Sequence, residues 1–363
     1  MPAGEIRVAA LFAANCYNHH TMRTTIDLFA GIGGIRKGFE RAGYETLYAA
    51  DVDPACKTTY DLNYRSAPLA MQNVMEIDPG TLPNFGVLLA GFPCQSFSVA
   101  GSKAGFADKG RGDLFFEIVK ILEAKRPDAV FLENVKHLWK HDHGRTFVII
   151  RELLEKQGYH IKFTALNSAD YGNVPQNRDR IYIVGFRDQK AYDSFEFPSK
   201  KPLSKSLTDI LDGEVPEKYY YREGWLYDRI KDEGMQPGLI YQWRRVYLRE
   251  NRTGRCFTLT ANMGMGGHNV PLVKDKSGLR RLTPRECARL QGFPESFKLP
   301  KDLPDSKLYK QIGNSVTVSV VERIARNMRK ALETAKKEKA NSRHTHEIEE
   351  RDNVAHSVAE YVA

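Results

Sequence analysis

A short apolar run that ends in a glycine-rich turn constrains the fold of this chain more than any other feature. Residues 24–29 are apolar and β-prone, and Ala30-Gly31-Ile32-Gly33-Gly34 follows directly. A helical pattern comes next, with Ile35, Phe39 and Ala42 on one face. Strand, glycine turn and helix in this order open a nucleotide-binding βαβ unit, although purely structural tight turns also need glycine. The pattern favours an α/β fold whose first turn approaches a ligand.

Acidic residues follow the second predicted strand. Residues 46–50 read as a strand that ends in Asp51-Val52-Asp53, just before Pro54. An acid at this strand tip commonly accepts hydrogen bonds from a ribose, and the alternative is the N-cap of the helix that begins at Pro54. We expect Asp53 to cap the helix and Asp51 to bind a ligand.

A cysteine follows the next predicted strand. Residues 85–91 are apolar or small, and Phe92 and Pro93 end the run just before Cys94. A thiol on a turn at the carboxyl end of a strand is a candidate nucleophile, while a lone cysteine is more commonly a buried structural residue. The glycine-rich basic segment 101–112 that follows reads as a loop that could close over a substrate, or as an ordinary solvated loop.

One acid and two arginines are the remaining candidate residues of a functional site. Glu133 follows the apolar strand 129–132 and is a candidate general acid with a raised pKa, or else a capping or salt-bridged residue. One residue separates Arg178 from Arg180 at the start of a strand over 180–186, so the two side chains point the same way. They suit an anion or a carbonyl oxygen, although a surface salt-bridge pair is a fair alternative.

The βαβ rhythm ends near residue 189. Up to about residue 278, turn residues, aromatics and arginines dominate, and the segment 258–269 starts like a strand and runs into a glycine-rich loop. Arginines interleaved with aromatic and short polar residues suit contacts with DNA bases and phosphates, although a solvated β-rich domain would look similar. Residues 145–156, before the rhythm ends, read as a helix. Further on, Thr283, Pro284 and Glu286 predict a helix start with a capping box, and residues 311–316 open the last helix of the fold.

The net charge favours a polyanionic partner. Lys and Arg number 54 against 45 Asp and Glu in 363 residues, which gives a formal charge of +9. The five cysteines include no Cys-x-x-Cys pair, so we expect no metal site and a reducing cytosol. No apolar run approaches the ~20 residues of a membrane helix, so we expect no membrane association.

Taken together, these motifs resemble the bacterial DNA (cytosine-5) methyltransferase family, the modification half of restriction–modification systems. The resemblance covers roughly residues 23–332. The motifs that carry it, in chain order, are Asp27-Leu28-Phe29-Ala30-Gly31-Ile32-Gly33-Gly34, Gly91-Phe92-Pro93-Cys94-Gln95, Glu133-Asn134-Val135, Gln176-Asn177-Arg178-Asp179-Arg180, residues 281–294 and Gly313-Asn314-Ser315-Val316.

The resemblance implies a covalent mechanism on a flipped-out cytosine. Cys94 matches the nucleophile that adds to C6 and makes C5 nucleophilic. Glu133 matches the residue that supplies a proton to N3. Arg180 matches the arginine that holds the O2 carbonyl, and Arg178 its neighbour near the thiol and a phosphate.

The resemblance also implies an S-adenosylmethionine site and a DNA-reading surface. Asn73 stands where members often carry an acid, and Ala100 where some have a serine that helps fill the gap left by the flipped base. The residues expected to bind the cofactor are Phe29, Ala30, Gly31, Gly33, Asp51, Val52, Asn73, Val74, Gly91, Pro93, Leu114, Asn314, Ser315 and Val316. Those expected to contact DNA are Gln95, Ser98, Lys103, Arg244, Arg245, Thr258, Thr260, Asn262, Gly266, Gly267 and His268.

The expected architecture is a Rossmann-like S-adenosylmethionine-dependent methyltransferase domain with a smaller, irregular, β-rich target-recognition domain. The expected limits are an N-terminal extension outside the fold over 1–21, a catalytic domain over 22–188, a target-recognition domain with hinge over 189–305, a returning C-terminal helix over 306–335 and a charged tail over 336–363.

The expected activity is methylation of C5 of cytosine in a short site of double-stranded DNA, and residues 241–269 are expected to set that site. We expect a monomer in the bacterial cytoplasm that pairs functionally with a restriction endonuclease without a stable complex. A tRNA cytosine-5 methyltransferase on the same scaffold is the alternative, and a DNA-binding repressor that kept the fold is a third reading.

Overall fold

A seven-stranded sheet forms the centre of the larger domain. The computed structural model describes the backbone of residues 21–93, 114–244, 246–264 and 270–362, with side chains up to residue 342. The strand order is β3-β2-β1-β4-β5-β7-β6, in which β1 to β5 run parallel and β7 runs antiparallel between β5 and β6. The strands are β1 Thr24–Leu28, β2 Glu45–Asp51, β3 Ala70–Met71, β4 Val87–Ala90, β5 Ala129–Val135, β6 His160–Asn167 and β7 Asp179–Phe186.

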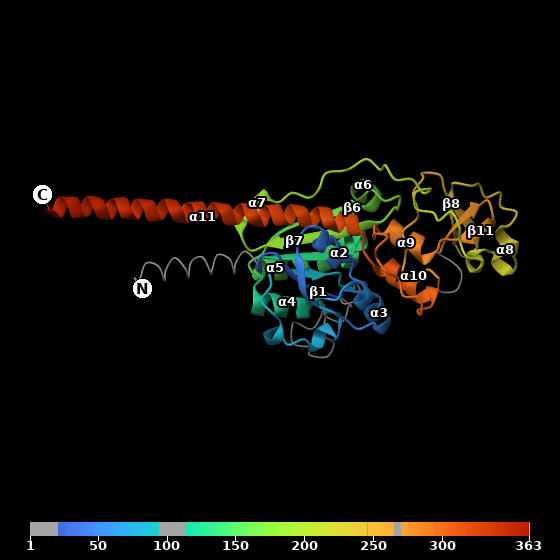
Figure 1. Cartoon of the computed structure of the whole chain (residues 1–363), viewed down its shortest axis with the longest axis horizontal. Coiled ribbons are helices and arrows are strands. Elements are labelled where there is room, and N and C mark those ends of the chain that lie inside the picture. Colours follow the sequence, from blue (N-terminus) through green and yellow to red (C-terminus); the bar gives the residue numbers. More distant parts are fainter. Residues whose placement is uncertain (1–20, 94–113, 245, 265–269, 363) are drawn as a thin grey trace.

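Helices cover both faces of this sheet, as Figure 1 shows. In β4, Leu88 and Ala90 pack on one face with α4 and α5, while Val87 and Leu89 pack on the other with α2 and α11. Both faces are therefore buried, which explains why β4 reads as an unbroken apolar run. The helices of this domain are α2 Gly34–Arg41, α3 Pro54–Asn63, η1 Val74–Glu76, η2 Pro79–Thr81, α4 Leu114–Lys125, η5 Lys136–Gly144, α5 Arg145–Lys156, α6 Ser168–Gly172, α7 Gln189–Ser194 and α11 Val318–Val362.

A second, smaller sheet carries its own apolar cluster. It is antiparallel, in the order β11-β10-β8-β9, and α8 packs against it around Leu226, Trp243 and Leu279. Its elements are η6 Glu217–Tyr219, α8 Trp225–Ile230, β8 Ile240–Arg244, β9 Tyr247–Asn251, β10 Pro271–Asp275 and β11 Gly278–Arg281. The expected combination of a Rossmann-like domain with a smaller β-rich domain is confirmed.

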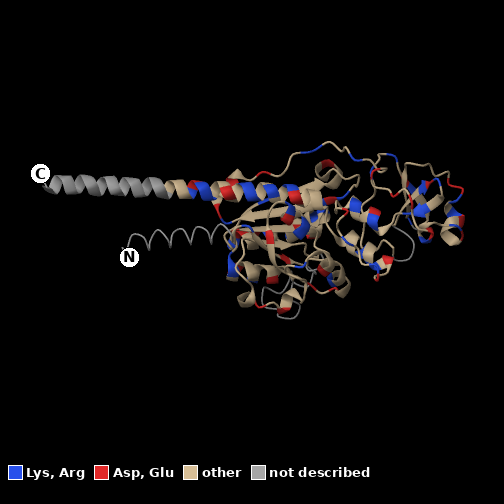
Figure 2. Cartoon of the chain, in the orientation of Figure 1, with Lys and Arg blue, Asp and Glu red and all other residues tan. Residues whose placement is uncertain are grey.

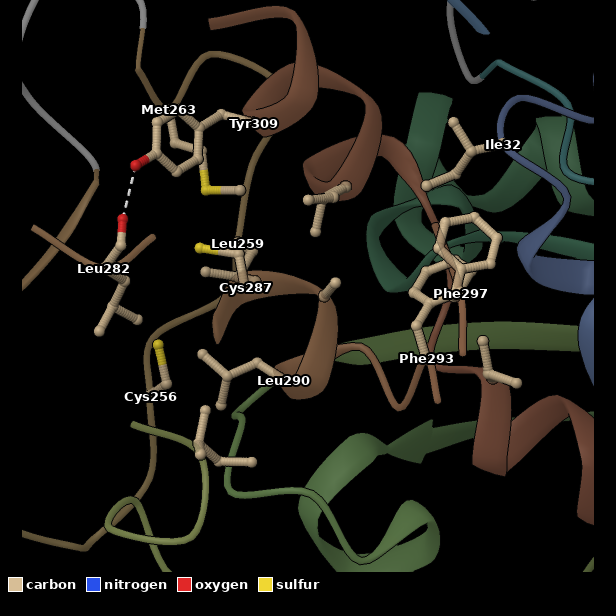
Figure 3. Close-up of a cluster of buried hydrophobic side chains, with 14 of the residues drawn as sticks. Ile32, Cys256, Leu259, Met263, Leu282, Cys287, Leu290, Phe293, Phe297 and Tyr309 are labelled. Carbon is tan, nitrogen blue, oxygen red and sulfur yellow. Dashed lines mark hydrogen bonds between the residues drawn. The ribbon is translucent and has the colours of Figure 1, made fainter. Parts of the chain in front are cut away.

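A third apolar cluster joins the two domains, and Figure 3 shows its centre. Helices α9 Pro284–Leu290 and α10 Asp305–Asn314 contribute to it together with the irregular segment 256–263. The Tyr309 hydroxyl donates to the Leu282 carbonyl at 2.5 Å, and Ile32 of the glycine turn belongs to the same cluster. A continuous apolar core thus connects the glycine turn with segment 256–263, which precedes β10, and with α9 and α10, which follow β11.

Arginines of α11 fasten the C-terminal helix to the catalytic domain. Arg326 and Arg329 donate to the carbonyls that end α2, and Arg323 donates to the carbonyls of Tyr171 and Ser199. Figure 2 shows many Lys and Arg residues, with a few acidic residues between them, along the described part of α11. Beyond the arginine contacts the helix continues past the body of the molecule (Figure 1). No helix in the described part of the chain is long and apolar enough to cross a membrane.

Several local predictions are confirmed. Asp53 caps α3 by accepting from the Ala55 N–H at 2.9 Å, and α5 spans the expected residues 145–156. Thr283 and Glu286 form the reciprocal capping box at the start of α9.

Two local predictions differ from the structure. The segment 311–316 was expected to open the last helix, but α10 ends at Asn314 and α11 begins at Val318. The segment 258–261 is not a strand, because the N–H and carbonyl of Leu259 bond to the side chains of Gln176 and Arg178 instead of to a β-ladder. Just past the expected boundary at 188, Ala191 and Phe195 lie in the core of the large sheet.

Candidate functional site

Two adjoining cavities lie at the carboxyl ends of the central strands. The larger, of about 520 Å³, is lined by residues that follow β1, β4 and β5 and by the turn between α10 and α11. The smaller, of about 210 Å³, lies between the ends of β1, β2 and β3 and the start of α4. In an open α/β sheet, ligands bind at this edge where the strand order reverses, which here is the gap between β1 and β4.

Nearly all of the predicted cofactor residues line these cavities. Gly33 is the exception among them. The lining residues that were predicted are Phe29, Ala30, Gly31, Asp51, Val52, Asn73, Val74, Gly91, Pro93, Leu114, Asn314, Ser315 and Val316.

Gly33 has a packing role. A Cβ on Gly33 would stand 2.4 Å from the Tyr64 ring, and its backbone is in the left-handed region. Its carbonyl accepts from the Tyr64 hydroxyl at 2.7 Å. Gly33 therefore has a packing reason to be glycine, the close approach of an aromatic ring, while its contact with the cofactor stays a prediction.

Asp51 links the glycine turn to the tip of β2. One carboxylate oxygen accepts from the Gly31 N–H at 2.9 Å and the other from the Asp53 N–H at 2.9 Å. Each oxygen keeps a second lone pair, so the carboxylate can still accept from two hydroxyls of a ribose. Phe29, beside it, has a left-handed backbone (φ 55°), which is strained for a bulky residue and turns its ring to the cavity wall.

The smaller cavity suits a flat, mostly apolar ring. Phe29, Val74 and Leu114 line it, and Val52 exposes 62% of its surface beside it. A β-branched side chain left this exposed offers an apolar surface that a flat ring could cover. Asn73 also lines the cavity, but its amide oxygen already accepts from the Met75 N–H at 3.1 Å, so that oxygen is partly committed to capping η1.

Glu133 and Arg180 form the charged centre of the larger cavity. Because Glu133 lies opposite Tyr182 in the β5–β7 ladder, Arg180 is its diagonal neighbour on the same face. Arg180 Nε lies 3.1 Å from Glu133 Oε1 as an ion pair, although the angle is too poor for a hydrogen bond. Burial raises the pKa of Glu133, and the positive charges of Arg180 and Arg178 oppose this rise.

Neighbouring residues position the acid and the loop that follows β4. A Cβ on Gly91 would stand 3.6 Å from Glu133 Oε2, so glycine keeps this side of the carboxyl open. The Asn134 side chain donates to the Phe92 carbonyl at 2.8 Å, which ties the loop to β5. The sequence interpretation gave Asn134 no role, although its place beside Glu133 in one motif was a usable signal. Cys94, the next residue after Pro93, lies outside the described residues.

Arg178, expected near a thiol and a phosphate, is held by backbone carbonyls in the wall of the larger cavity. The residue is 1% exposed, and its guanidinium donates to the carbonyls of Leu259 at 2.7 Å, Gly313 at 3.1 Å and Ser315. Burial lowers the pKa of Arg178 to about 9, and the charge of Arg180 acts in the same direction. The two arginines line the same cavity, but only Arg180 pairs with the acid.

Some of the predicted DNA-contacting side chains are exposed, and others are hydrogen-bonded within the protein. Arg244 and Asn262 are exposed, and Thr260 donates to the Asn262 side chain at 2.6 Å. Thr258 donates to the Asn177 carbonyl at 2.5 Å, so its hydroxyl hydrogen is used in a contact between segment 256–263 and the residues just before β7. The remaining predicted DNA contacts lie outside the described residues, namely Gln95, Ser98, Lys103, Arg245, Gly266, Gly267 and His268.

Sequence interpretation also missed the wall formed by Leu259, Gln311 and Gly313, which line the larger cavity. Apolar or neutral residues carry no chemical signal of their own, although Gly313 opens the motif Gly313-Asn314-Ser315-Val316 and Gln311 lies just before it. Among the described residues, no cluster of three or more His, Cys, Asp or Glu side chains could hold a metal ion.

A family model described as C-5 cytosine-specific DNA methylase matches residues 23–330. The type II methyltransferase M.Bsp6I of Bacillus sp. (strain RFL6) is 51% identical over 310 residues, which cover 84% of this chain and 98% of the relative. The type II methyltransferase M.HaeII of Haemophilus aegyptius is 41% identical over 86% of this chain and 94% of its own.

Solved structures share the fold at lower identity. The Dnmt2 methyltransferase of S. pombe has a TM-score of 0.67 at 20% identity, over 85% of this chain and 99% of that one. A putative DNA modification methyltransferase encoded within an E. coli prophage has a TM-score of 0.62 at 20% identity, over 85% and 99%.

Proposed function

Because the chain belongs to the C-5 cytosine-specific DNA methylase family, it is a DNA (cytosine-5) methyltransferase that uses S-adenosylmethionine, and we propose that the larger cavity receives the target cytosine. The observation that carries this assignment is the pairing of buried Glu133 with partly exposed Arg180 beside the cavities lined by the predicted cofactor residues. A cytosine offers N3 to an acid and O2 to a guanidinium on one edge, and this pair presents both groups together.

Glu133 is proposed as the proton donor to N3. Its raised pKa means that a larger fraction of the carboxyl carries a proton near neutral pH than in water. When the Cys94 thiolate adds to C6, that proton passes to N3 and the negative charge that would develop on the ring is neutralised. Arg180 donates to O2 and holds the ring in the same orientation.

The remaining steps restore the aromatic ring. When bound, S-adenosylmethionine would supply an electrophilic methyl group to C5 of the enamine and leave as S-adenosylhomocysteine. A base then removes the C5 proton, the N3 proton returns to Glu133, the Cys94–C6 bond breaks, and the thiolate leaves. Asp51 and Val52 at the tip of β2 would hold the ribose and adenine of the cofactor, while Ser315 and Val316 would close the opposite wall.

The smaller domain is proposed to read the DNA sequence. It supplies exposed Arg244 and Asn262, and the irregular segment 256–263 leads from it to the cavity wall. The catalytic domain would then span residues 22–197, since Ala191 and Phe195 pack on the large sheet, and the target-recognition domain with its hinge would extend to 305. Residues 306–335 would return to the catalytic domain, with 336–363 as an appendage.

The biological role follows from the named relatives, which are type II methyltransferases. We propose that methylation of one short duplex site protects DNA from a cognate restriction endonuclease, without a stable complex between the two proteins. Each strand is methylated in a separate event, so a monomer in the bacterial cytoplasm suffices.

The test is methylation of a plasmid library by the purified protein with S-adenosylmethionine, read by bisulfite sequencing. We expect C5 marks within one short motif for the wild type. Glu133→Gln should lower the rate by on the order of 10²-fold, because the amide cannot supply the proton. Its affinity for the cofactor, measured by calorimetry, should stay within about two-fold of the wild type.

Glu155→Gln on the outer face of α5 is the matched control and should leave both quantities unchanged, since Glu155 is half-exposed and remote from the cavity. Loss of cofactor affinity in Glu133→Gln would give the residue a structural role instead. Methylation of tRNA with unmarked DNA would contradict the DNA assignment.

A further inference from the structure

The Arg178 guanidinium donates hydrogen bonds to the backbone of two chain segments. One segment is proposed to contact DNA, and the other is proposed to contact the cofactor. Leu259 precedes Thr260 and Asn262, the proposed DNA contacts, while Gly313 and Ser315 belong to the cavity wall proposed for the cofactor. All three carbonyls accept from one buried side chain. A planar guanidinium with fixed donor directions satisfies three acceptors only when they hold one relative arrangement.

Other contacts hold the same two segments together. The Gln176 side chain accepts from the Leu259 N–H at 3.1 Å and donates to the Leu290 carbonyl at 2.8 Å. Gln291 donates to the carbonyls of Ile312 at 2.9 Å and Ser315 at 3.3 Å. Leu259 and Leu290 lie close together in the cluster of Figure 3. Each of these polar side chains is fully or almost fully buried.

Backbone packing also connects the segments. A Cβ on Gly313 would stand 2.1 Å from the Thr260 carbonyl oxygen, so the two main chains are in direct contact. A displacement of Thr260 therefore pushes on Gly313, which lies two residues before Ser315. Separating the segments around Thr260 and Gly313 would also take carbonyl acceptors away from the buried Arg178 charge. Arrangements between the joined and the separated state are therefore strongly disfavoured.

We propose that Arg178 is a positioning residue that couples the DNA-reading segment to the cofactor wall, so that DNA and S-adenosylmethionine bind with positive cooperativity. The inference rests on the proposed roles of these two walls. DNA that orders Thr260 and Asn262 favours the arrangement in which the three carbonyls converge on Arg178. The same arrangement fixes Ser315 for the cofactor, so each ligand raises the affinity for the other by the same factor.

The experiment compares Arg178→Lys with Arg323→Lys. Arg323 also donates to two backbone carbonyls, those of Tyr171 and Ser199, but it lines neither described cavity. Calorimetry would give the Kd of S-adenosylhomocysteine for each full-length protein, alone and with a duplex that carries the site found by bisulfite sequencing. A duplex without that site corrects for non-specific binding.

We expect the specific duplex to tighten cofactor-product binding about five-fold or more in the wild type and in Arg323→Lys. In Arg178→Lys the ratio should fall to within about two-fold of one, because an ammonium cannot reach three carbonyls at once. A ratio in Arg178→Lys equal to that of the wild type, or a wild-type ratio of one, would overturn the inference.

A second variant covers the case in which Arg178→Lys does not fold. Gln291→Met preserves volume but removes the donors to Ile312 and Ser315, so it should lower the ratio as well; an unchanged ratio would count against the coupling. Failure of the proposed function is recognised separately, because the wild type would then bind S-adenosylhomocysteine or the duplex without methylating any DNA.

Discussion

Arg178 and Arg180 stand two residues apart, yet their guanidiniums have different partners. Arg180 is partly exposed in the cavity and pairs with Glu133, while Arg178 is buried and bonds to backbone carbonyls. The difference arises at the start of β7, because only Arg180 lies within the β5–β7 ladder. At the scale of the residue, the location of each side chain therefore decides its role. Buried Arg178 is held by backbone carbonyls, while Arg180 remains available to the proposed substrate in the cavity.

Asp27 in β1 carries a second prediction at this scale. It is fully buried, and neither carboxylate oxygen has a partner of good hydrogen-bond geometry among the described residues. Burial raises the pKa of Asp27 to about 7, against a smaller opposite effect of Arg36. The folded state therefore holds the proton more tightly than the unfolded state, and folding stability decreases as the pH rises from about 4 to about 7.

Asp27→Asn cannot ionise and should remove this loss, which amounts to as much as about 4 kcal/mol for a shift of this size. We expect the stability of the variant relative to wild type to increase between pH 5 and pH 8, measured by urea unfolding. Asp193→Asn on exposed α7 is the control and should show no such trend. A stability difference that stays constant across this pH range would refute the ionisation of Asp27.

At the scale of the element, α9 depends on polar contacts at its first turn. Thr283 accepts from the Glu286 N–H at 3.1 Å, and Glu286 accepts from the Thr283 N–H at 2.7 Å. Glu286 also receives two hydrogen bonds from buried Arg280 at 2.9 Å and one from the Asp212 N–H. The helix start is thus tied to β11 and to the loop before the small sheet, and not only to its own turn.

These contacts predict unequal costs for two substitutions. Thr283→Ala should lower the free energy of unfolding by about 1 kcal/mol, the usual value of an N-cap. Glu286→Leu should cost about 3–5 kcal/mol, because it leaves the buried Arg280 charge without this carboxylate. Denaturant titration of both variants measures the difference; equal losses would show that Glu286 acts only as a capping residue.

At the scale of the whole molecule, two sheets meet through a shared core. The small sheet has its own apolar cluster around Trp243 and Leu279, while Cys256, Leu259 and Met263 belong to the cluster that also contains Ile32. The small domain can therefore vary its outer surface without disturbing the catalytic sheet, provided that the junction residues keep their packing.

This organisation predicts how DNA specificity can be transferred. Residues 241–269 were expected from the sequence to set the target, but this segment crosses both clusters. Replacing residues 217–281 with the equivalent segment of a relative that methylates another site, while keeping Cys256, Leu259 and Met263, should change the methylated motif. Bisulfite sequencing would read the outcome, and an unchanged motif with retained activity would place sequence readout elsewhere.

The sequence by itself determined the features that depend on neighbours along the chain. Buried strands, the Asp53 cap, α5 and the Thr283 capping box follow from apolar patterns and local hydrogen bonds, and the ordered motifs indicated the family and most of the residues that line the cavities. Local chemistry suffices there because the partners lie within a few residues of each other.

Only the tertiary structure decided the roles that depend on distant partners. Arg178 bonds to a carbonyl 81 residues away and to another 135 residues away, and Gly33 is required by the ring of Tyr64. The exposed tip of Val52 becomes a cavity wall only when β1, β2 and β3 lie side by side. No spacing rule encodes such contacts, because the free energy that fixes them comes from burial after the chain has folded.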